Sequence, residues 1–231
     1  MMAASVTDNR GVATSLTEAV LVISIVAVVT GMALTAAMDR IEDARLTRAM
    51  ADTEMIGISI HSFMHDTGFA PAFKSGDALG PEDDIFLVLE SGGSDPGMDP
   101  SLNWPVPTDD EDDEDTYERF ENQLIKNLPS STGAPYPRIG QTSYARFKGW
   151  NGPYVSRMPS SDPWDNKYLV NIQLLTAQGV QMAGETLELE TGQRAAVYVI
   201  SAGPDRQLET RFDQVADSFA AGGDDIVYRI Q

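Results

Sequence analysis

The residues best suited to chemistry are three aspartates near the C-terminal end. Asp205 lies in the stretch SAGPD, and Asp224 and Asp225 precede the last apolar run. Calcium takes about six to eight oxygen ligands from carboxylates, carbonyls and water, in a flexible geometry. The three carboxylates, with carbonyl oxygens near Ser201 and Gly203, therefore make a candidate calcium site. An ordinary acidic turn in an aspartate-rich chain is the alternative.

The two histidines are a weaker metal candidate. His61 and His65 have the four-residue spacing of a metal-binding pair on a helix. The stretch HSFMH lacks the glutamate of the HExxH zinc motif, so an exposed helix face is the favoured interpretation. The sequence has no Gly-rich phosphate loop at a strand–helix junction and no Ser or Lys in a recognisable nucleophile setting. We therefore expect a protein that is not an enzyme.

Glu18 is notable because a long charge-free stretch, residues 19–38, follows it directly. A helix of about 20 residues is about 30 Å long, the thickness of a bilayer's hydrocarbon core. We predict a single retained membrane span. The alternatives are a buried core helix, which normally shows a polar face, and a cleavable secretory signal. A secretory signal begins with a basic leader, whereas here the single positive charge of Arg10 is balanced by Asp8, which disfavours that alternative.

Composition favours one globular domain plus this anchor. The chain has 231 residues and 42% hydrophobic content, enough for a sizeable core. Its net charge is −19, and residues 39–231 carry nearly all of it. Such an acidic surface repels nucleic acid and attracts divalent cations, so no nucleic-acid partner is expected. The absence of cysteine excludes disulfides, thiol catalysis and thiolate metal sites.

The span is predicted to continue into a second, amphipathic half of one helix over residues 14–66. Asp66-Thr67-Gly68 supplies the stop, with Gly68 suited to a left-handed backbone. One stripe recurs every three or four residues along this half: Leu46, Ala49, Thr53, Ile56, Ile60 and Phe63. This apolar stripe must be buried against other residues, and we expect a globular head, residues 67–231, to pack on it.

A large mixed insertion, residues 72–147, occupies the first part of this head. PEDDIFLVLESGG (81–93) and DTYERFENQLIKNL (115–128) are predicted to be short helices. The acidic run DDEDDED (109–115) is predicted to be a solvated loop rather than a specific ion site.

The C-terminal region is typical of a small antiparallel sheet. β-Branched and aromatic runs at 168–175, 195–203 and 224–230 are the predicted strands, and residues 164–167 are a predicted hairpin turn. The resulting fold class is α+β. A long N-terminal helix, membrane-spanning in its first half and amphipathic in its second, packs on a small antiparallel sheet that carries a large mixed insertion.

Three stretches of the sequence form a recognisable series. They are TSLTE before the apolar run, DARLTRAMADTEMIGISIHSFMHDTGFAP after it, and WNGPYVSRMPSSDPWDNKY with VYVISAGPD and GGDDIVYRI near the C-terminus. Together they resemble the type IV pilin-like superfamily, and most closely the major pseudopilins of type II secretion systems. The resemblance covers residues 11–71 and 148–231. Ala stands at position 13 where that family usually has Gly, and Thr at position 14 where it usually has Phe.

The resemblance implies roles for particular residues. A leader of residues 1–13 would be removed between Ala13 and Thr14, and the new N-terminus methylated. In a filament the amine of Thr14 would pair with Glu18 of a neighbour, because a lone charge among apolar helices is costly. The alternative is that Glu18 is an interfacial acid near lipid headgroups. The resemblance also implies calcium in the loop of Ser201, Asp205, Asp224 and Asp225.

The implied function is structural: a subunit of a periplasmic pseudopilus that drives type II protein secretion. The implied partners are further copies of the chain, minor pseudopilins, an inner-membrane platform protein and the prepilin peptidase. Residues 19–38 would hold the chain in the bacterial inner membrane, with its head in the periplasm. Two alternatives stay open: a surface type IV pilin for adhesion, motility or DNA uptake, and a monomeric membrane-anchored binding module.

Overall fold

The computed structural model describes the chain in separate stretches. These are residues 10–76, 85–105, 118–130, 133–140, 149–176 and 193–231, with side chains described from residue 16 onward. The chain divides into two compact units, Met1–Ala44 and Arg45–Gln231.

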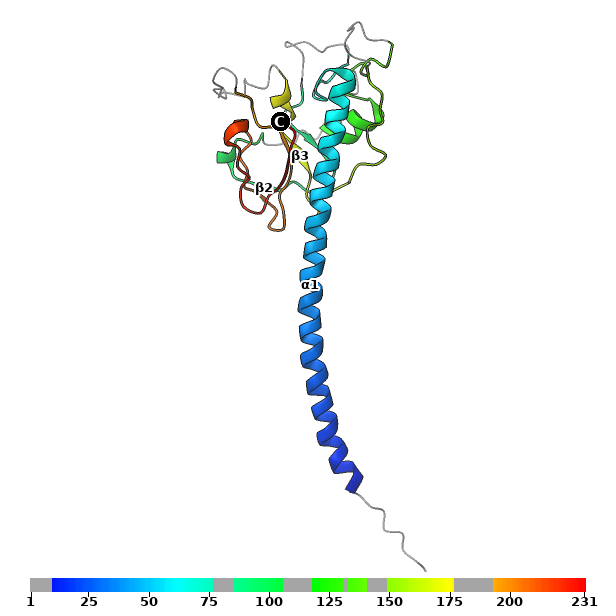
Figure 1. Cartoon of the computed structure of the whole chain (residues 1–231), viewed down its shortest axis with the longest axis vertical. Coiled ribbons are helices and arrows are strands. Elements are labelled where there is room, and N and C mark those ends of the chain that lie inside the picture. The colour runs from blue at the N-terminus through cyan, green and yellow to red at the C-terminus, as the bar shows by residue number, and fades with distance from the viewer. Residues whose placement is uncertain (1–9, 77–84, 106–117, 131–132, 141–148, 177–192) are drawn as a thin grey trace, which may run out of the picture. The chain divides into compact units, whose positions relative to one another are not determined.

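Helix α1 (Arg10–Thr67) is a single helix of 58 residues (Figure 1). The helix predicted over 14–66 is therefore confirmed. Among the described residues it is the helix long and apolar enough to cross a membrane. Large apolar side chains of the predicted span are exposed, for example Ile23 at 68% and Met32 at 69%. Such uncovered apolar surface is stable in a lipid environment and costly in water.

Hydroxyl groups within the apolar stretch are satisfied by their own helix. Ser24 Oγ donates to the carbonyl of Val20 at 2.8 Å, and Thr35 Oγ1 donates to the carbonyl of Met32 at 3.0 Å. In hydrocarbon an unpaired hydroxyl costs several kcal/mol, so these bonds make the two side chains compatible with a membrane span.

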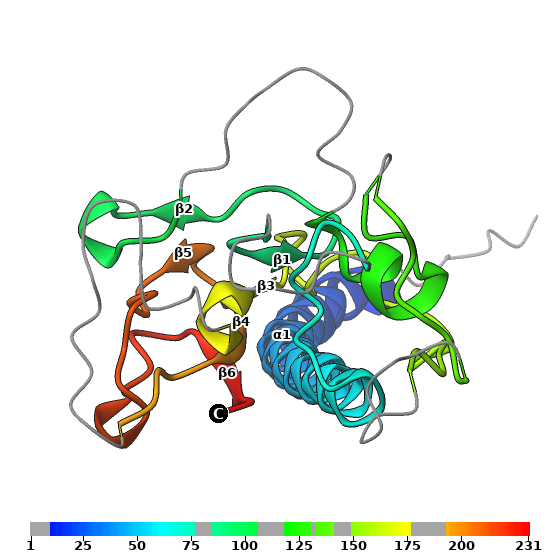
Figure 2. The same ribbon diagram turned by 90° about the horizontal axis from the view of Figure 1, so that it is seen from above.

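The main sheet of the second unit has four strands in the order β1-β3-β4-β6, with every neighbouring pair antiparallel (Figure 2). The strands are β1 (Leu89–Glu90), β3 (Leu169–Val170), β4 (Tyr198–Ser201) and β6 (Ile226–Arg229). The strands predicted at 195–203 and 224–230 are thus confirmed in their central residues, and the strand predicted at 168–175 is confirmed only near its start. A second, two-stranded sheet pairs β2 (Gly97–Met98) in parallel with β5 (Gln207–Leu208).

Strand β3 is much shorter than predicted, because a side chain takes over its pairing. The Asn171 amide donates to the carbonyls of Ala196 and Phe212, and its oxygen accepts from the Tyr198 N–H. The backbone is then free to turn into the 3-10 helix η4 (Ile172–Leu175). A buried asparagine can satisfy backbone groups that a strand would otherwise pair.

The amphipathic half of α1 packs on this sheet through the predicted stripe. Leu46 is half-buried, and the other stripe residues are buried: Ala49, Thr53, Ile56, Ile60 and Phe63. Gly57 marks the closest approach, since a Cβ there would lie 2.3 Å from Cδ1 of Tyr228 on β6. Only a glycine leaves room for the tyrosine ring at that distance.

The end of α1 is as predicted. Gly68 has a φ of 80°, and its N–H donates to the Met64 carbonyl at 2.8 Å. A left-handed glycine at this position closes the last helical turn without a Cβ penalty.

The helix predicted at 81–93 is wrong over its described residues, 85–93. This stretch is extended, and Leu89 and Glu90 form the edge strand β1 against β3. The run IFLVLE carries aromatic and β-branched residues, and pairing with β3 buries Phe86 and Leu89. Sheet pairing and burial outweigh a local helical pattern of this length.

The helix predicted at 115–128 is shorter than expected. Residues 115–117 lie outside the described part of the chain. Beyond them, a helical turn at Phe120 runs into the π-helix η3 (Asn122–Lys126), which ends at Asn127 with a φ of 55°. Phe120 and Leu124 of the predicted stripe are buried, whereas Leu128 is 41% exposed.

The predicted hairpin turn at 164–167 is also corrected. The turn spans Asp162 to Asp165, closed by the Asp165 N–H on the Asp162 carbonyl at 3.1 Å, and Asp165 has a φ of 74°. Asn166 then bridges Ser94 in parallel, so the turn does not join two paired strands. The positive φ at an aspartate was the correct part of the prediction.

The described parts of the insertion 72–147 belong to the same core as α1 and the main sheet. They bury large aromatic and aliphatic side chains there: Phe73, Phe86, Leu89, Trp104, Phe120, Leu124 and Tyr136. Phe63 of α1 stacks edge-on against Tyr136, with ring centroids 4.9 Å apart. The insertion is thus integral to the head. The acidic run 109–115 lies outside the described residues.

Candidate functional site

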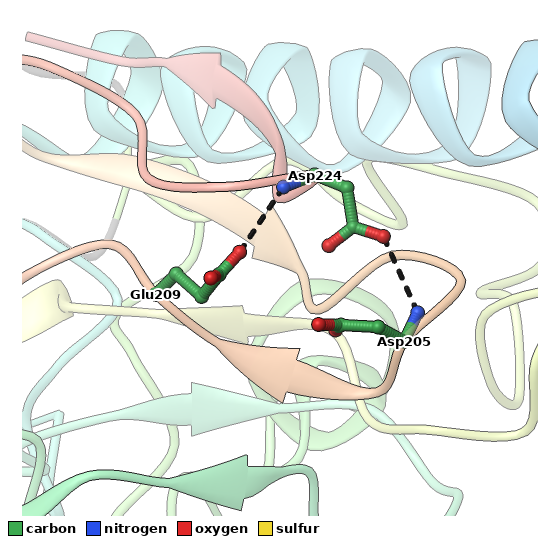
Figure 3. Close-up of side chains that lie close together, drawn as sticks. All are labelled: Asp205, Glu209 and Asp224. Atoms are coloured by element: carbon green, nitrogen blue, oxygen red, sulfur yellow. Dashed lines mark hydrogen bonds between the residues drawn. The ribbon is translucent and has the colours of Figure 1, made fainter.

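Three carboxylates meet on the surface beside β5. Asp205 and Asp224, both singled out in the sequence, lie with Glu209, and one carboxylate oxygen from each falls within 4.8 Å of the others (Figure 3). All three side chains are exposed. Asp224 Oδ2 accepts from the Asp205 N–H at 3.3 Å, and Glu209 Oε2 accepts from the Asp224 N–H at 3.2 Å. We call this group the acidic triad.

Glu209 was missed by sequence reasoning. It follows β5 directly, and the chain between Asp205 and Asp224 folds back to place it beside both. Its position relative to Asp205, four residues on, was visible in the sequence. Its proximity to Asp224 depends on tertiary structure, for which the sequence offers no local signal.

A tight turn after β4 positions the first member of the triad. Gly203 has a φ of 67°, and a Cβ there would lie 2.5 Å from the Asp224 carbonyl oxygen. Asp205 Oδ1 accepts from the Gln207 N–H at 2.7 Å, which fixes the entry into β5. The glycine lets two chain segments approach closely enough for their carboxylates to meet.

Asp225 has a different task from Asp224. Its Oδ2 accepts from the backbone N–H groups of Glu209 and Thr210, at 2.9 and 2.6 Å. Its Oδ1 is buried and has no hydrogen-bond partner among the described residues. Burial raises the pKa of the Asp225 carboxyl to about 6, against the hydrogen bonds that lower it. Asp225 therefore holds the backbone at Glu209, next to the triad rather than within it.

Ser201 is buried in β4, and its side chain is engaged elsewhere. Its Oγ donates to Asp162 Oδ2 at 2.8 Å and accepts from the Gly203 N–H at 3.3 Å. The hydroxyl thus fixes the turn that leads to Asp205. The structure therefore brings together Asp205 and Asp224, and gives Ser201 and Asp225 supporting positions around them.

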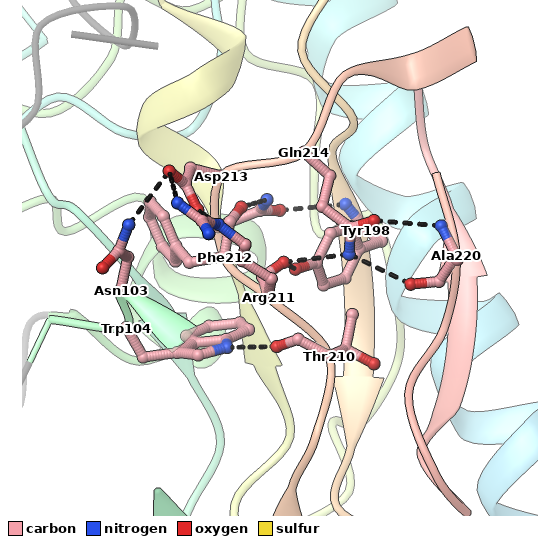
Figure 4. Close-up of polar contacts among 10 residues, drawn as sticks. Asn103, Trp104, Tyr198, Thr210, Arg211, Phe212, Asp213, Gln214 and Ala220 are labelled. Atoms are coloured by element: carbon pink, nitrogen blue, oxygen red, sulfur yellow. Dashed lines mark hydrogen bonds and ion pairs between the residues drawn. The ribbon is translucent and has the colours of Figure 1, made fainter. Parts of the chain in front are cut away.

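The segment between β5 and β6 is anchored to the core on both sides (Figure 4). Trp104 Nε1 donates to the Thr210 carbonyl at 2.8 Å, and the Tyr198 hydroxyl donates to the Arg211 carbonyl. The Gln214 amide donates to the Ala220 carbonyl at 3.1 Å. The first two bonds tie the start of the connection, directly after Glu209, to the core, and the third closes a turn within the connection.

The triad has the chemistry of a hard divalent-cation site. Three exposed carboxylates this close repel one another unless a cation or protons intervene. They offer oxygens only, the ligand type that calcium and magnesium prefer.

At the other end of the chain, Ala13 and Thr14 lie in the first turns of α1. Glu18 follows one turn after Thr14, and its side chain is exposed. It stands directly before the exposed apolar residues of the predicted span.

The two histidines lie on the exposed face of α1, as predicted. His65 Nδ1 is 3.1 Å from Asp66 Oδ1. Within the described stretches, the acidic triad is the group of three potential metal ligands that the structure brings together.

Comparison of the chain with family models, with curated proteins and with solved structures found no match.

Proposed function

We propose that this chain is a membrane-anchored structural subunit of the type IV pilin-like class, a major pseudopilin of a type II secretion system. One observation carries the proposal. An exposed acid, Glu18, stands directly before a charge-free apolar stretch, on the same helix whose second half packs on a small antiparallel sheet. A simple lipid anchor does not require an acid at that point.

The physical role of Glu18 in this proposal is charge pairing. Cleavage after Ala13 would give Thr14 a free α-amine, which is cationic near neutral pH. In a bundle of apolar helices that amine needs a partner, and Glu18 of a neighbouring copy supplies one. A pair between copies fixes how far one helix is shifted along the next.

The location and partners follow from the same proposal. Residues 19–38 hold the chain in a bacterial inner membrane before assembly, with the head in the periplasm. The partners are copies of the chain, minor pseudopilins, an inner-membrane platform protein and the prepilin peptidase. The role is structural rather than catalytic.

Calcium is the proposed cofactor of the head. The acidic triad supports it, with Asp205 and Asp224 as ligands and Glu209 as a third. Asp225 and Ser201 contribute by holding the backbone on which these ligands stand.

The proposal is tested on the full-length chain expressed in bacteria together with a prepilin peptidase. Mass spectrometry of the chain purified from membranes should find an N-terminus at Thr14. Sedimentation of sheared cell material should recover the chain in filaments. An intact leader and a chain that sediments as a monomer would instead identify a membrane-anchored binding module. Filaments attached to the outer cell surface would identify a surface pilin.

A further inference from the structure

A cavity of about 350 Å³ lies in the second unit, between β1, the start of the η3 segment and the loop 156–160. Two arginines, Arg119 and Arg157, stand in its wall. Gly92 lets the loop 156–160 approach closely, because a Cβ at Gly92 would lie 2.7 Å from the Ser160 carbonyl oxygen; Arg119 Nη1 lies 3.8 Å from the same point. Apolar side chains of Phe120, Ile125 and Met158 complete the lining.

The acids of the wall are already neutralised by lysines. Glu90 Oε2 lies 2.9 Å from Lys167 Nζ, and Glu121 Oε1 lies 3.1 Å from Lys126 Nζ. Burial raises the pKa of the Glu90 carboxyl; Lys167 and, to a smaller extent, Arg119 lower it.

The two arginines of the wall differ from these acids. Among the residues that the structure describes, no carboxylate lies within ion-pair distance of Arg119 or Arg157. Within this part of the chain the cavity therefore presents two guanidinium groups without a carboxylate partner, in a protein whose net charge is −19.

Guanidinium groups bind carboxylates through paired, charge-assisted hydrogen bonds. The hydroxyls of Ser156 and Ser160 stand in the same wall and can add donors. The matching ligand is thus a peptide segment with closely spaced carboxylates.

We propose that this cavity receives the acidic run 109–115 of a second copy of the chain. The inference rests on the proposed function, in which copies polymerise. Two copies that each carry −19 repel one another, so a stable contact needs places where acid meets base. The run DDEDDED supplies consecutive carboxylates. Because donor and acceptor surfaces differ, the contact is head-to-tail and can propagate along a filament.

The test uses a fluorescent peptide of residues 107–117 and the full-length chain in detergent micelles, followed by fluorescence anisotropy. We expect saturable binding that weakens as salt rises. Arg119→Gln and Arg157→Gln should each weaken the Kd about tenfold, because each removes one guanidinium–carboxylate pair. Arg194→Gln, an exposed arginine outside the cavity lining, is the matched control and should bind like wild type. A peptide with Asn and Gln in place of its acids should not bind.

Three results would overturn the inference. The first is no binding by wild type, and the second is equal binding by Arg119→Gln and wild type. The third is binding that appears only after the chain's own residues 109–115 are changed to Asn and Gln, since the cavity is then filled within one chain. A wild-type chain that binds the peptide through both arginines yet forms no filaments would refute the proposed function and leave the cavity assignment standing.

Discussion

The hydroxyl of Ser201 donates to Oδ2 of Asp162 at 2.8 Å, and both side chains are buried. Asp162 Oδ1 also accepts from the backbone N–H groups of Trp164 and Asn166, at 2.9 and 2.7 Å. One carboxylate thus joins the central strand β4 to the turn at 162–165. The Ser201 hydroxyl also accepts from the Gly203 N–H, in the turn that carries Asp205. The position of the acidic triad therefore depends on Asp162, a buried acid far from the triad in sequence.

Asp162→Ala should lower the free energy of unfolding by about 3 kcal/mol, because it leaves buried donors without an acceptor. Urea titration of the full-length chain in detergent, followed by tryptophan fluorescence, measures this. Ser201→Ala removes one partner of the network and should cost about 1 kcal/mol. An Asp162→Ala chain that unfolds at the wild-type urea midpoint would show that Asp162 does not support the fold.

Millimolar calcium should stabilise the full-length chain through the acidic triad. A ligand at a hundredfold excess over its Kd adds about 2.7 kcal/mol to the native state. Magnesium at equal concentration is the control for general charge screening, since it prefers a strict octahedron and keeps its waters. Thermal unfolding with each ion gives the comparison.

Variants of the triad separate the specific part of that effect from the general one. Asp224→Ala and Glu209→Gln should each abolish the difference between calcium and magnesium. Glu121→Gln, an exposed acid outside the triad, should keep it. Equal stabilisation by the two ions in wild type would mean that the triad is a solvated acidic turn.

Asp225 should make stability depend on pH in an unusual direction. Burial raises its folded pKa to about 6 from an ordinary value of 3.8, so the folded state holds the proton more tightly than the unfolded state. The contribution is fully present below pH 3.8 and is lost as pH rises through about 6. In metal-free buffer, this carboxyl therefore destabilises the fold at neutral pH.

Asp225→Asn keeps an acceptor for the Glu209 and Thr210 N–H groups and removes the charge. The unfolding free energy of wild type minus that of Asp225→Asn should fall between pH 4 and pH 6, measured by urea titration at each pH. A difference that stays constant across this window would show that Asp225 ionises normally.

Gly57→Ala should destabilise the contact between α1 and β6. The new Cβ would lie 2.3 Å from the Tyr228 ring, which forces helix and strand apart or moves the ring. We expect a loss of about 2 kcal/mol in urea titration. In a Tyr228→Ala background the same change should cost much less. Equal costs in both backgrounds would mean that the ring is not what excludes the methyl group.

The sequence alone was sufficient for the elements with a long, regular pattern. The stripe from Leu46 to Phe63 and the helix end at Gly68 are confirmed. Apolar residues that recur every three or four positions over about twenty residues fit a helix and no other regular structure. The three C-terminal strands were found because their runs are rich in β-branched and aromatic residues. The run at 85–90 was misassigned, because a short run with five apolar residues packs equally well in a helix or a strand until a partner is known. Its partner, β3, lies far away in sequence.

The candidate site was predictable in part. Asp205 and Asp224 were visible as turn acids, but Glu209 joins them only through the fold. Ser201 and Asp225 were placed in the right neighbourhood, yet their side chains are directed to Asp162 and to the Glu209 backbone. The sequence shows which carboxylates and hydroxyls lie near this loop. The hydrogen bonds that each side chain makes in the fold decide which of these groups can still bind a cation.

Glu18→Val should leave membrane insertion intact and impair assembly. Valine makes the span more apolar, so extraction of membranes with alkaline carbonate should retain the variant as it retains wild type. Filament yield should fall, because the amine of Thr14 would lose its partner among the apolar helices. Glu18→Asp keeps the charge on a shorter side chain and should restore part of the yield. Sedimentation of sheared filaments from cells making equal amounts of each protein gives the measurement. If Glu18→Val fills filaments as well as wild type, Glu18 is an interfacial acid without a role in pairing.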